Sequence, residues 1–84
     1  PNPFNPYLTI EFSITEPQSN VSVGIYDLYG RKIKNILNEH MEIGNYSILW
    51  DGLNDNGNEV SSGVYIVKLK LNNKFINHKV TFLK

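Results

Sequence analysis

Short segments of this chain alternate apolar and polar residues, and this period-two pattern most constrains what the chain can fold into. Such alternation is typical of strands with one buried face. No window sustains the helical spacing i, i+3, i+4, i+7 beyond two turns. In residues 63–71, Tyr65, Val67 and Leu69 fall on one face while Lys68 and Lys70 fall on the other. The pattern therefore predicts an all-β protein.

The same alternation marks further strands separated by turn-forming residues. We expect strands at residues 7–14, 21–26, 31–37, 46–50, 59–61, 63–71 and 74–83. Gly30 can supply a positive φ for a hairpin after the second strand, and Asn72-Asn73 suits a two-residue hairpin turn. Residues 38–45 read as a polar link. In 31–37 the register is the least defined, because Ile33 and Leu37 share a face that Ile36 does not.

About seven short strands at spacings of roughly 8 to 12 residues favour an immunoglobulin-like, fibronectin III-like β-sandwich of antiparallel strands. A closed barrel is the alternative. The 84 residues make room for one domain, 1–84, with a Pro-rich entrance segment at 1–6.

Composition argues against several partner classes. Eight Lys and Arg balance eight Asp and Glu, so no global field attracts nucleic acid. The absence of cysteine excludes disulfides and thiolate metal sites. The longest apolar run, residues 64–67, is far short of the roughly 20 residues that span a bilayer, and we expect no membrane insertion. Twelve asparagines indicate many turns.

No arrangement of catalytic or cofactor-binding residues is recognised, so we expect no enzyme, no cofactor and no metal. His40, in the predicted link, and His78, in the last strand, lie beside no nucleophile at a known spacing. Residues 51–59 are rich in Asp and Asn, which suits calcium, but a turn whose side chains bond their own backbone is the simpler interpretation. Five aromatic residues could instead form a sugar-binding platform or pack in the core: Tyr7, Tyr26, Tyr29, Tyr46 and Trp50.

Four blocks in order carry a family resemblance. They are Pro1-Asn2-Pro3-Phe4-Asn5-Pro6 with 9–12, then 23–31 ending in Tyr-Asp-Leu-Tyr-Gly-Arg, then Trp50-Asp51-Gly52 with Asp55-Asn56-Gly57, and Ser62-Gly63-Val64-Tyr65 with 79–84. Together they resemble the type A C-terminal sorting domain of the type IX (Por) secretion system. The same blocks are similar to the immunoglobulin-like module of the flagellar hook-capping protein.

The resemblance implies a non-enzymatic sorting module linked to an upstream cargo domain. Its partners would be the outer-membrane translocon and the sorting and cleavage machinery, and the cargo would reach the cell surface or be released. Candidate recognition residues by match are Gly30, Arg31, Gly63, Tyr65, Lys79 and Lys84. The last strand could also pair with a translocon strand by β-augmentation. The alternatives are an accessory module that binds glycan weakly and a structural immunoglobulin-like spacer.

Overall fold

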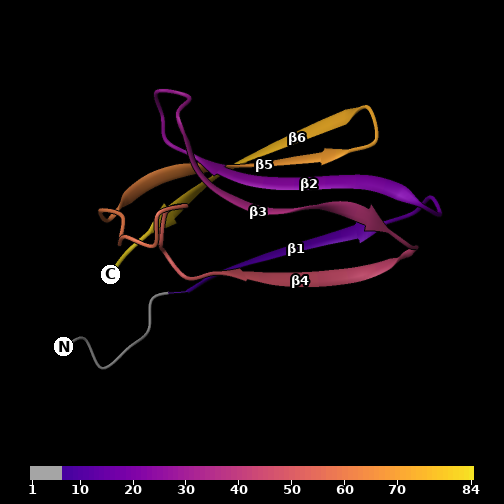
Figure 1. Ribbon diagram of the computed structural model, residues 1–84, viewed down its shortest axis with the longest axis horizontal. Coiled ribbons are helices and arrows are strands. Elements are labelled where there is room, and N and C mark those ends of the chain that lie inside the picture. The colour runs from indigo at the N-terminus through magenta and orange to yellow at the C-terminus, as the bar shows by residue number, and fades with distance from the viewer. Residues whose placement is uncertain (1–6) are drawn as a thin grey trace.

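A computed structural model of the chain describes residues 7–84 and shows two β-sheets packed face to face (Figure 1). The small sheet pairs β1 with β4, and the large sheet has the order β3-β2-β5-β6, all antiparallel. The strands are β1 (Leu8–Ile14), β2 (Ser19–Tyr26), β3 (Lys32–Met41), β4 (Gly44–Trp50), β5 (Gly63–Leu71) and β6 (Lys74–Phe82). The expected all-β, immunoglobulin-like sandwich is confirmed. The Pro-rich segment 1–6 lies outside the described residues.

The core forms between the sheets from the alternate residues that the sequence pattern places on one face. In β1, Ile10, Phe12 and Ile14 are buried while their neighbours are exposed. In β2, Val21, Val23 and Ile25 are at most 1% exposed. Burial of each such side chain contributes about 1.5–3 kcal/mol relative to exposure. No helix within residues 7–84 is long and apolar enough to cross a membrane.

An aromatic cluster closes one end of the core. Trp50 is completely buried, and its ring lies 4.8 Å from that of Phe82 and 5.4 Å from that of Tyr65, measured between centroids. Trp50 Nε1 donates a hydrogen bond to Leu53 O at 3.0 Å. The Tyr65 hydroxyl donates to Ser61 O, four residues upstream, at 2.6 Å. A tyrosine that reaches back in this way resembles the tyrosine corner of immunoglobulin-like folds.

The third strand is longer than the sequence indicates. We expected 31–37 followed by a polar link at 38–45, with His40 in that link, whereas β3 runs to Met41 and includes His40. The register between β2 and β3 shifts between Val23 and Gly24 and again between Ile25 and Tyr26. These bulges explain how Ile33, Ile36 and Leu37 all pack against the core. Beyond them, pairing with β2 holds polar residues in a strand that their own propensities do not favour.

Of the seven expected strands, the fifth, at residues 59–61, is wrong, and the described residues form six strands. Residues 59–61 form no strand, and the segment makes only an isolated bridge between Leu53 and Glu59. The bridge closes the loop between β4 and β5 on itself. The barrel alternative is also wrong, since residues 7–84 form two separate sheets.

Both predicted hairpin turns are confirmed. Gly30 has φ of 86° between β2 and β3, and Asn72 has φ of 54° between β5 and β6. Antiparallel strands joined by short turns place alternate connections at opposite ends of a sandwich. The β2–β3 turn, the long β4–β5 connection and the C-terminus therefore lie at one end, on the left of Figure 1. We call this the β2–β3 end.

Candidate recognition site at the β2–β3 end

A shallow open groove at the β2–β3 end brings three predicted recognition residues together. Arg31 contributes from the β2–β3 turn, whereas Gly63 and Tyr65 contribute from the start of β5. Asn54, Glu59, Val60 and Ser61, from the β4–β5 connection, complete the lining with Asp27, Leu28, Tyr29, Ile33 and Val64. Segments separate in the sequence thus form one surface.

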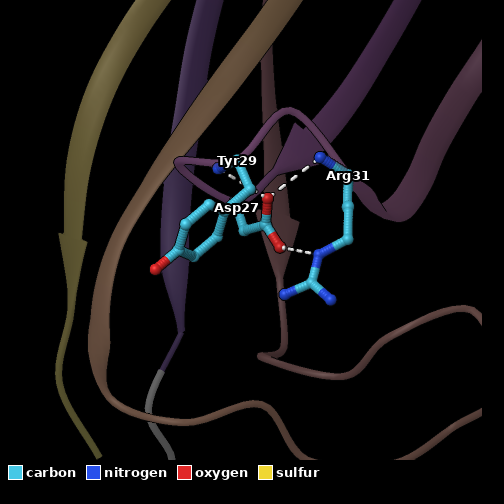
Figure 2. A network of polar contacts seen from close by, with 3 residues as sticks. All are labelled: Asp27, Tyr29 and Arg31. Atoms are coloured by element: carbon cyan, nitrogen blue, oxygen red, sulfur yellow. Dashed lines mark hydrogen bonds and ion pairs between the residues drawn. The ribbon is translucent and has the colours of Figure 1, made fainter.

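The β2–β3 turn is organised by the Asp27 carboxylate. Asp27 Oδ1 accepts hydrogen bonds from the backbone N–H groups of Tyr29 and Arg31, each at 2.9 Å. Asp27 Oδ2 accepts from Arg31 Nε at 2.8 Å (Figure 2). Gly30 N donates to Asp27 O at 3.1 Å and Asp27 N donates to Arg31 O at 3.0 Å. A single acidic side chain therefore fixes both the turn and the arginine that follows it.

These contacts set the ionisation of Asp27. Desolvation alone would raise the pKa of the carboxyl. The hydrogen bonds from the Arg31 N–H, the Arg31 guanidinium and the Tyr29 N–H, with the positive charge of Arg31, outweigh that effect and hold the pKa below its usual value. Asp27 is therefore ionised at neutral pH, as its ion pair with Arg31 requires.

Arg31 is held and yet exposed. Its side chain is 76% exposed, against 14% for that of Asp27. Its guanidinium carbon lies 5.6 Å from the centre of the Tyr29 ring. Asp27 bonds only the Nε of the guanidinium, and the two terminal nitrogens form no hydrogen bond with the residues drawn in Figure 2. A pre-oriented guanidinium with spare donors can bind a carboxylate of a partner with little further loss of entropy.

Apolar side chains stand exposed around Arg31. Tyr29 is 88% exposed, Leu28 56% and Val64 37%, and all three line the groove. Tyrosine and arginine beside aliphatic side chains are enriched in the centres of protein–protein interfaces. The composition of this surface fits a protein partner better than a small polar ligand.

The matched residues take different parts in this surface. Gly30 makes the turn, Gly63 opens β5, and Tyr65 is a core residue that is only 8% exposed. Burial is the larger cause that raises the pKa of the Tyr65 hydroxyl, and the negative charge of Asp27 adds to the effect. Tyr65 therefore supports the groove from below rather than offering its ring to a partner.

The two matched lysines are separated. Lys84 stays near the groove, because its N–H donates to Ser62 Oγ at 3.0 Å and its Nζ lies 3.8 Å from Glu59 Oε2. Lys79 pairs with Ile66 along β6, away from the groove lining. β6 itself is the outer strand of the large sheet, which is the position that β-augmentation requires.

The loop that suggested calcium uses its oxygens internally. Asn54 Oδ1 accepts from Asn56 N and Asn58 N, both at 3.0 Å, and Asp51 Oδ1 accepts from Leu53 N at 3.1 Å. The interpretation of this loop as a self-bonded turn is confirmed. Within residues 7–84, no three or more His, Cys, Asp or Glu side chains are placed to hold a metal ion together. His40 and His78 are both exposed in strands of the large sheet.

The five rings proposed as a sugar platform do not form a row. Trp50 is fully buried, and Tyr46 is half-buried and stacked on Phe12 with centroids 5.6 Å apart. Tyr29 is exposed at the β2–β3 end, and Tyr26 lies on the outer face of the large sheet. The core interpretation holds for Trp50, and a platform made of these five residues is wrong.

Sequence reasoning missed several members of the groove. Asp27, Leu28 and Val64 were not singled out, although an aspartate four residues before an arginine across a glycine turn is a readable signal for Asp27. No local pattern predicts that Val64 and Leu28 come together, because their proximity depends on the pairing of β2 with β5.

Comparisons with known proteins are consistent with the fold. The family described as FlgD Ig-like domain matches residues 6–74. The solved structure of FlgD from P. aeruginosa aligns with a TM-score of 0.68 and 25% sequence identity, over 92% of this chain and 60% of that one. The chain thus spans less than two thirds of the FlgD chain that it resembles. No curated protein matches the sequence.

Proposed function

The chain belongs to the FlgD Ig-like domain family, and we propose that within this family it serves as a sorting module of an exported protein. In this role it directs a covalently linked cargo through the type IX outer-membrane translocon to the cell surface or the medium. The domain itself performs no catalysis. The observation that carries the proposal is the groove at the β2–β3 end, where matched residues from separate blocks of the sequence meet.

The groove supports this role through its chemistry. A sorting signal that is read as a folded shape needs a reproducible surface, and Asp27 gives the β2–β3 turn one geometry by three side-chain hydrogen bonds. Tyr29 and Leu28 offer apolar contact area, and Arg31 offers a directed positive charge. The expected partner is therefore a protein surface with an apolar patch next to a carboxylate.

A reporter assay tests the proposal. The domain is fused behind a reporter that carries a Sec signal peptide, and the fusion is expressed in a type IX-competent bacterium. We expect the reporter outside the cell with the native domain, and in the periplasm with Arg31→Gln or Tyr29→Ser. Periplasmic retention of the native fusion, or unchanged export of both variants, would refute the proposal.

Point variants are preferable to a truncation of the last strand. Deletion of residues 79–84 would remove Phe82, a core residue that is 3% exposed, and would confound recognition with unfolding. Tyr29→Ser alters a side chain that is 88% exposed and should leave the fold intact. Leu49→Ser is the matched control, because Leu49 is 60% exposed but lies in the small sheet, away from the groove.

A second candidate is a structural spacer in an extracellular assembly. It is favoured by the likeness to FlgD, which covers 92% of this chain. A spacer requires stability but no specific groove. If the native fusion stays in the periplasm while the purified domain is folded and stable, the spacer role replaces the sorting role.

A further inference from the structure

The outer face of the large sheet carries an asymmetric charge that the neutral composition hides. Alternate residues of β2, β5 and β6 point away from the core, and the register places Lys68 and Lys70 of β5 on the same face as Lys79 of β6, which pairs with Ile66. Lys32 of β3 joins them opposite Tyr26. We call this surface the lysine face.

No strand position of the lysine face within residues 7–84 holds an acidic residue, and the Asp55 carboxylate lies at its β3 edge, where Oδ1 accepts a hydrogen bond from Asn35 N at 3.0 Å. Its other strand positions hold amide, hydroxyl, apolar and glycine residues and one histidine: Asn20, Ser22, Gly24, Tyr26, Asn35, Asn38, His40, Val64, Ile66, Phe75, Asn77 and Thr81. The described ion pairs are Asp27 with Arg31 and Glu59 with Lys84, and both lie at the β2–β3 end. The lysine face is therefore a positive surface on a protein of zero net charge.

A groove that includes Gly24 in its lining lies on this face, and we call it the Gly24 hollow. A Cβ at this position would lie 3.0 Å from Tyr26 Cε1 and 3.5 Å from Lys32 Cε, so the neighbouring side chains lean over the glycine. The groove at the hollow is lined by Tyr26, Lys32, Asn35, Lys68, Lys70 and Phe75, among others. A compact anionic group can enter there and meet several ammonium groups.

The aromatic rings orient two of these lysines. Lys68 Nζ lies 4.4 Å from the centre of the Tyr26 ring, and Lys70 Nζ lies 5.3 Å from that of Phe75. Contacts of this kind restrict long side chains without neutralising their charge. The Phe75 side chain is itself 68% exposed and leaves apolar surface beside the hollow.

A second groove on the same face is lined by amides. Asn20, Asn35 and Asn38 border it together with Lys32 and Lys70. The side chains of these three asparagines form no hydrogen bond within residues 7–84, although the backbone N–H groups of Asn20 and Asn35 do. An amide both donates and accepts, which matches the hydroxyl groups of a sugar.

We propose that the lysine face binds an acidic polysaccharide, with the Gly24 hollow receiving a carboxylate and the asparagine groove receiving sugar hydroxyls. The ammonium groups supply charge complementarity, the amides match hydroxyls, and the exposed Phe75 ring can stack on a pyranose. This surface is distinct from the β2–β3 groove, and the inference does not rest on the sorting role.

The same observations disfavour other anionic partners. A nucleic acid would find no long-range attraction, because the net charge is zero, and only four lysines to neutralise its phosphates. An acidic peptide would present carboxylates but few hydroxyl groups for the amides of the asparagine groove. The mixture of ammonium, amide and aromatic groups fits the sugar acid best.

Calorimetry at low ionic strength tests the proposal by measuring binding to polygalacturonate. The comparison ligands are neutral dextran, dextran sulfate, polyglutamate and a single-stranded oligonucleotide. We expect polygalacturonate to bind most tightly and neutral dextran not to bind. The double variant Lys68→Gln/Lys70→Gln should bind roughly fivefold to tenfold more weakly, as expected for two exposed charges. Gly24→Ala should also weaken binding, because its Cβ would displace the Tyr26 and Lys32 side chains that line the hollow without changing the charge.

The matched control is Lys34→Gln/Lys74→Gln, which removes the same charge from outside the lysine face. Lys34 pairs with Ile25 and Lys74 pairs with Leu71, so the register assigns both lysines to the other side of the sheet. This control should bind as the native domain does. Equal loss in both double variants, no binding by the native domain, or tighter binding of dextran sulfate, polyglutamate or the oligonucleotide would overturn the proposal.

Discussion

Replacing Gly52 by alanine tests how the long β4–β5 connection is locked onto the core. Gly52 has φ of 77°, a left-handed conformation that L-residues adopt at a cost of about 1–2 kcal/mol. A Cβ there would also lie 2.9 Å from Phe82 Cε2 and 3.1 Å from Phe82 Cε1, and closer still to Cζ. Because Phe82 packs against Trp50, the ring cannot move without disturbing the core.

The chain offers its own matched control for this change. Gly57 has φ of 81°, almost the same as that of Gly52, but a Cβ there would meet no atom within 4 Å. Gly57→Ala therefore carries only the conformational cost of about 1–2 kcal/mol. Gly52→Ala adds the overpacking cost of about 1–3 kcal/mol and should destabilise by roughly 2–5 kcal/mol in all.

Urea unfolding followed by Trp50 fluorescence measures both variants, because the chain contains a single tryptophan and it is fully buried. The midpoint should fall further for Gly52→Ala than for Gly57→Ala with an unchanged m-value. On heating, each 1 kcal/mol should lower Tm by about 4–8 °C in a domain of this size. Equal losses in the two variants would refute the argument that Phe82 blocks the Gly52 Cβ.

Three further variants follow from single contacts. Asp27→Asn should lower the free energy of unfolding near neutral pH. The difference in this free energy between variant and native protein should shrink as the pH falls through the pKa of Asp27, which lies below its usual 3.8. Acid titrations followed by fluorescence measure it. A gap that is constant with pH would contradict the ion pair. Tyr65→Phe should cost about 1–2 kcal/mol by leaving Ser61 O without its donor. Because the pKa of Tyr65 is raised, the native protein should also lose stability as the pH rises above 10.0, through the folded pKa. Tyr65→Phe should lose less stability over this range. Equal losses would show that Tyr65 ionises in the folded protein without penalty. Asn54→Ala should speed hydrogen exchange at the Asn56 and Asn58 amides, whereas unchanged exchange would show that Asn54 Oδ1 does not hold them.

Much of the fold could be predicted from alternation, because the inward positions of a half-buried strand hold apolar residues and the outward positions hold polar ones. Ile10, Phe12 and Ile14 in β1 are examples, and the bounds of β5 agree with the expected segment. Turn chemistry was equally local at Gly30.

The failures have a common cause, which is that strand pairing is not visible in a segment's own pattern. β3 contains bulges and polar residues that only the ladder with β2 holds in place, so its own pattern shows neither its length nor its register. Residues 59–61 alternate like a strand but find no partner strand, because Glu59 bridges back to Leu53. The alternation within each segment shows neither event.

Several residues of the candidate site could be predicted from the sequence, but their position around one groove could not. Arg31, Gly63 and Tyr65 came from a resemblance, and only the fold shows that they border one groove. The fold also separates their roles, since Arg31 is exposed and Tyr65 is buried. The lysine face escaped detection because its charges come from three strands and cancel in the total.

Site-specific photocrosslinking during export tests the central claim most directly. A photoreactive amino acid replaces Tyr29 in the groove or, as a control, Leu49 in the small sheet; their side chains are 88% and 60% exposed. The account predicts that the probe at position 29 crosslinks to an outer-membrane protein of the secretion machinery and that the probe at position 49 does not. Crosslinks from position 49 alone, or from neither position while the cargo is exported, would contradict it.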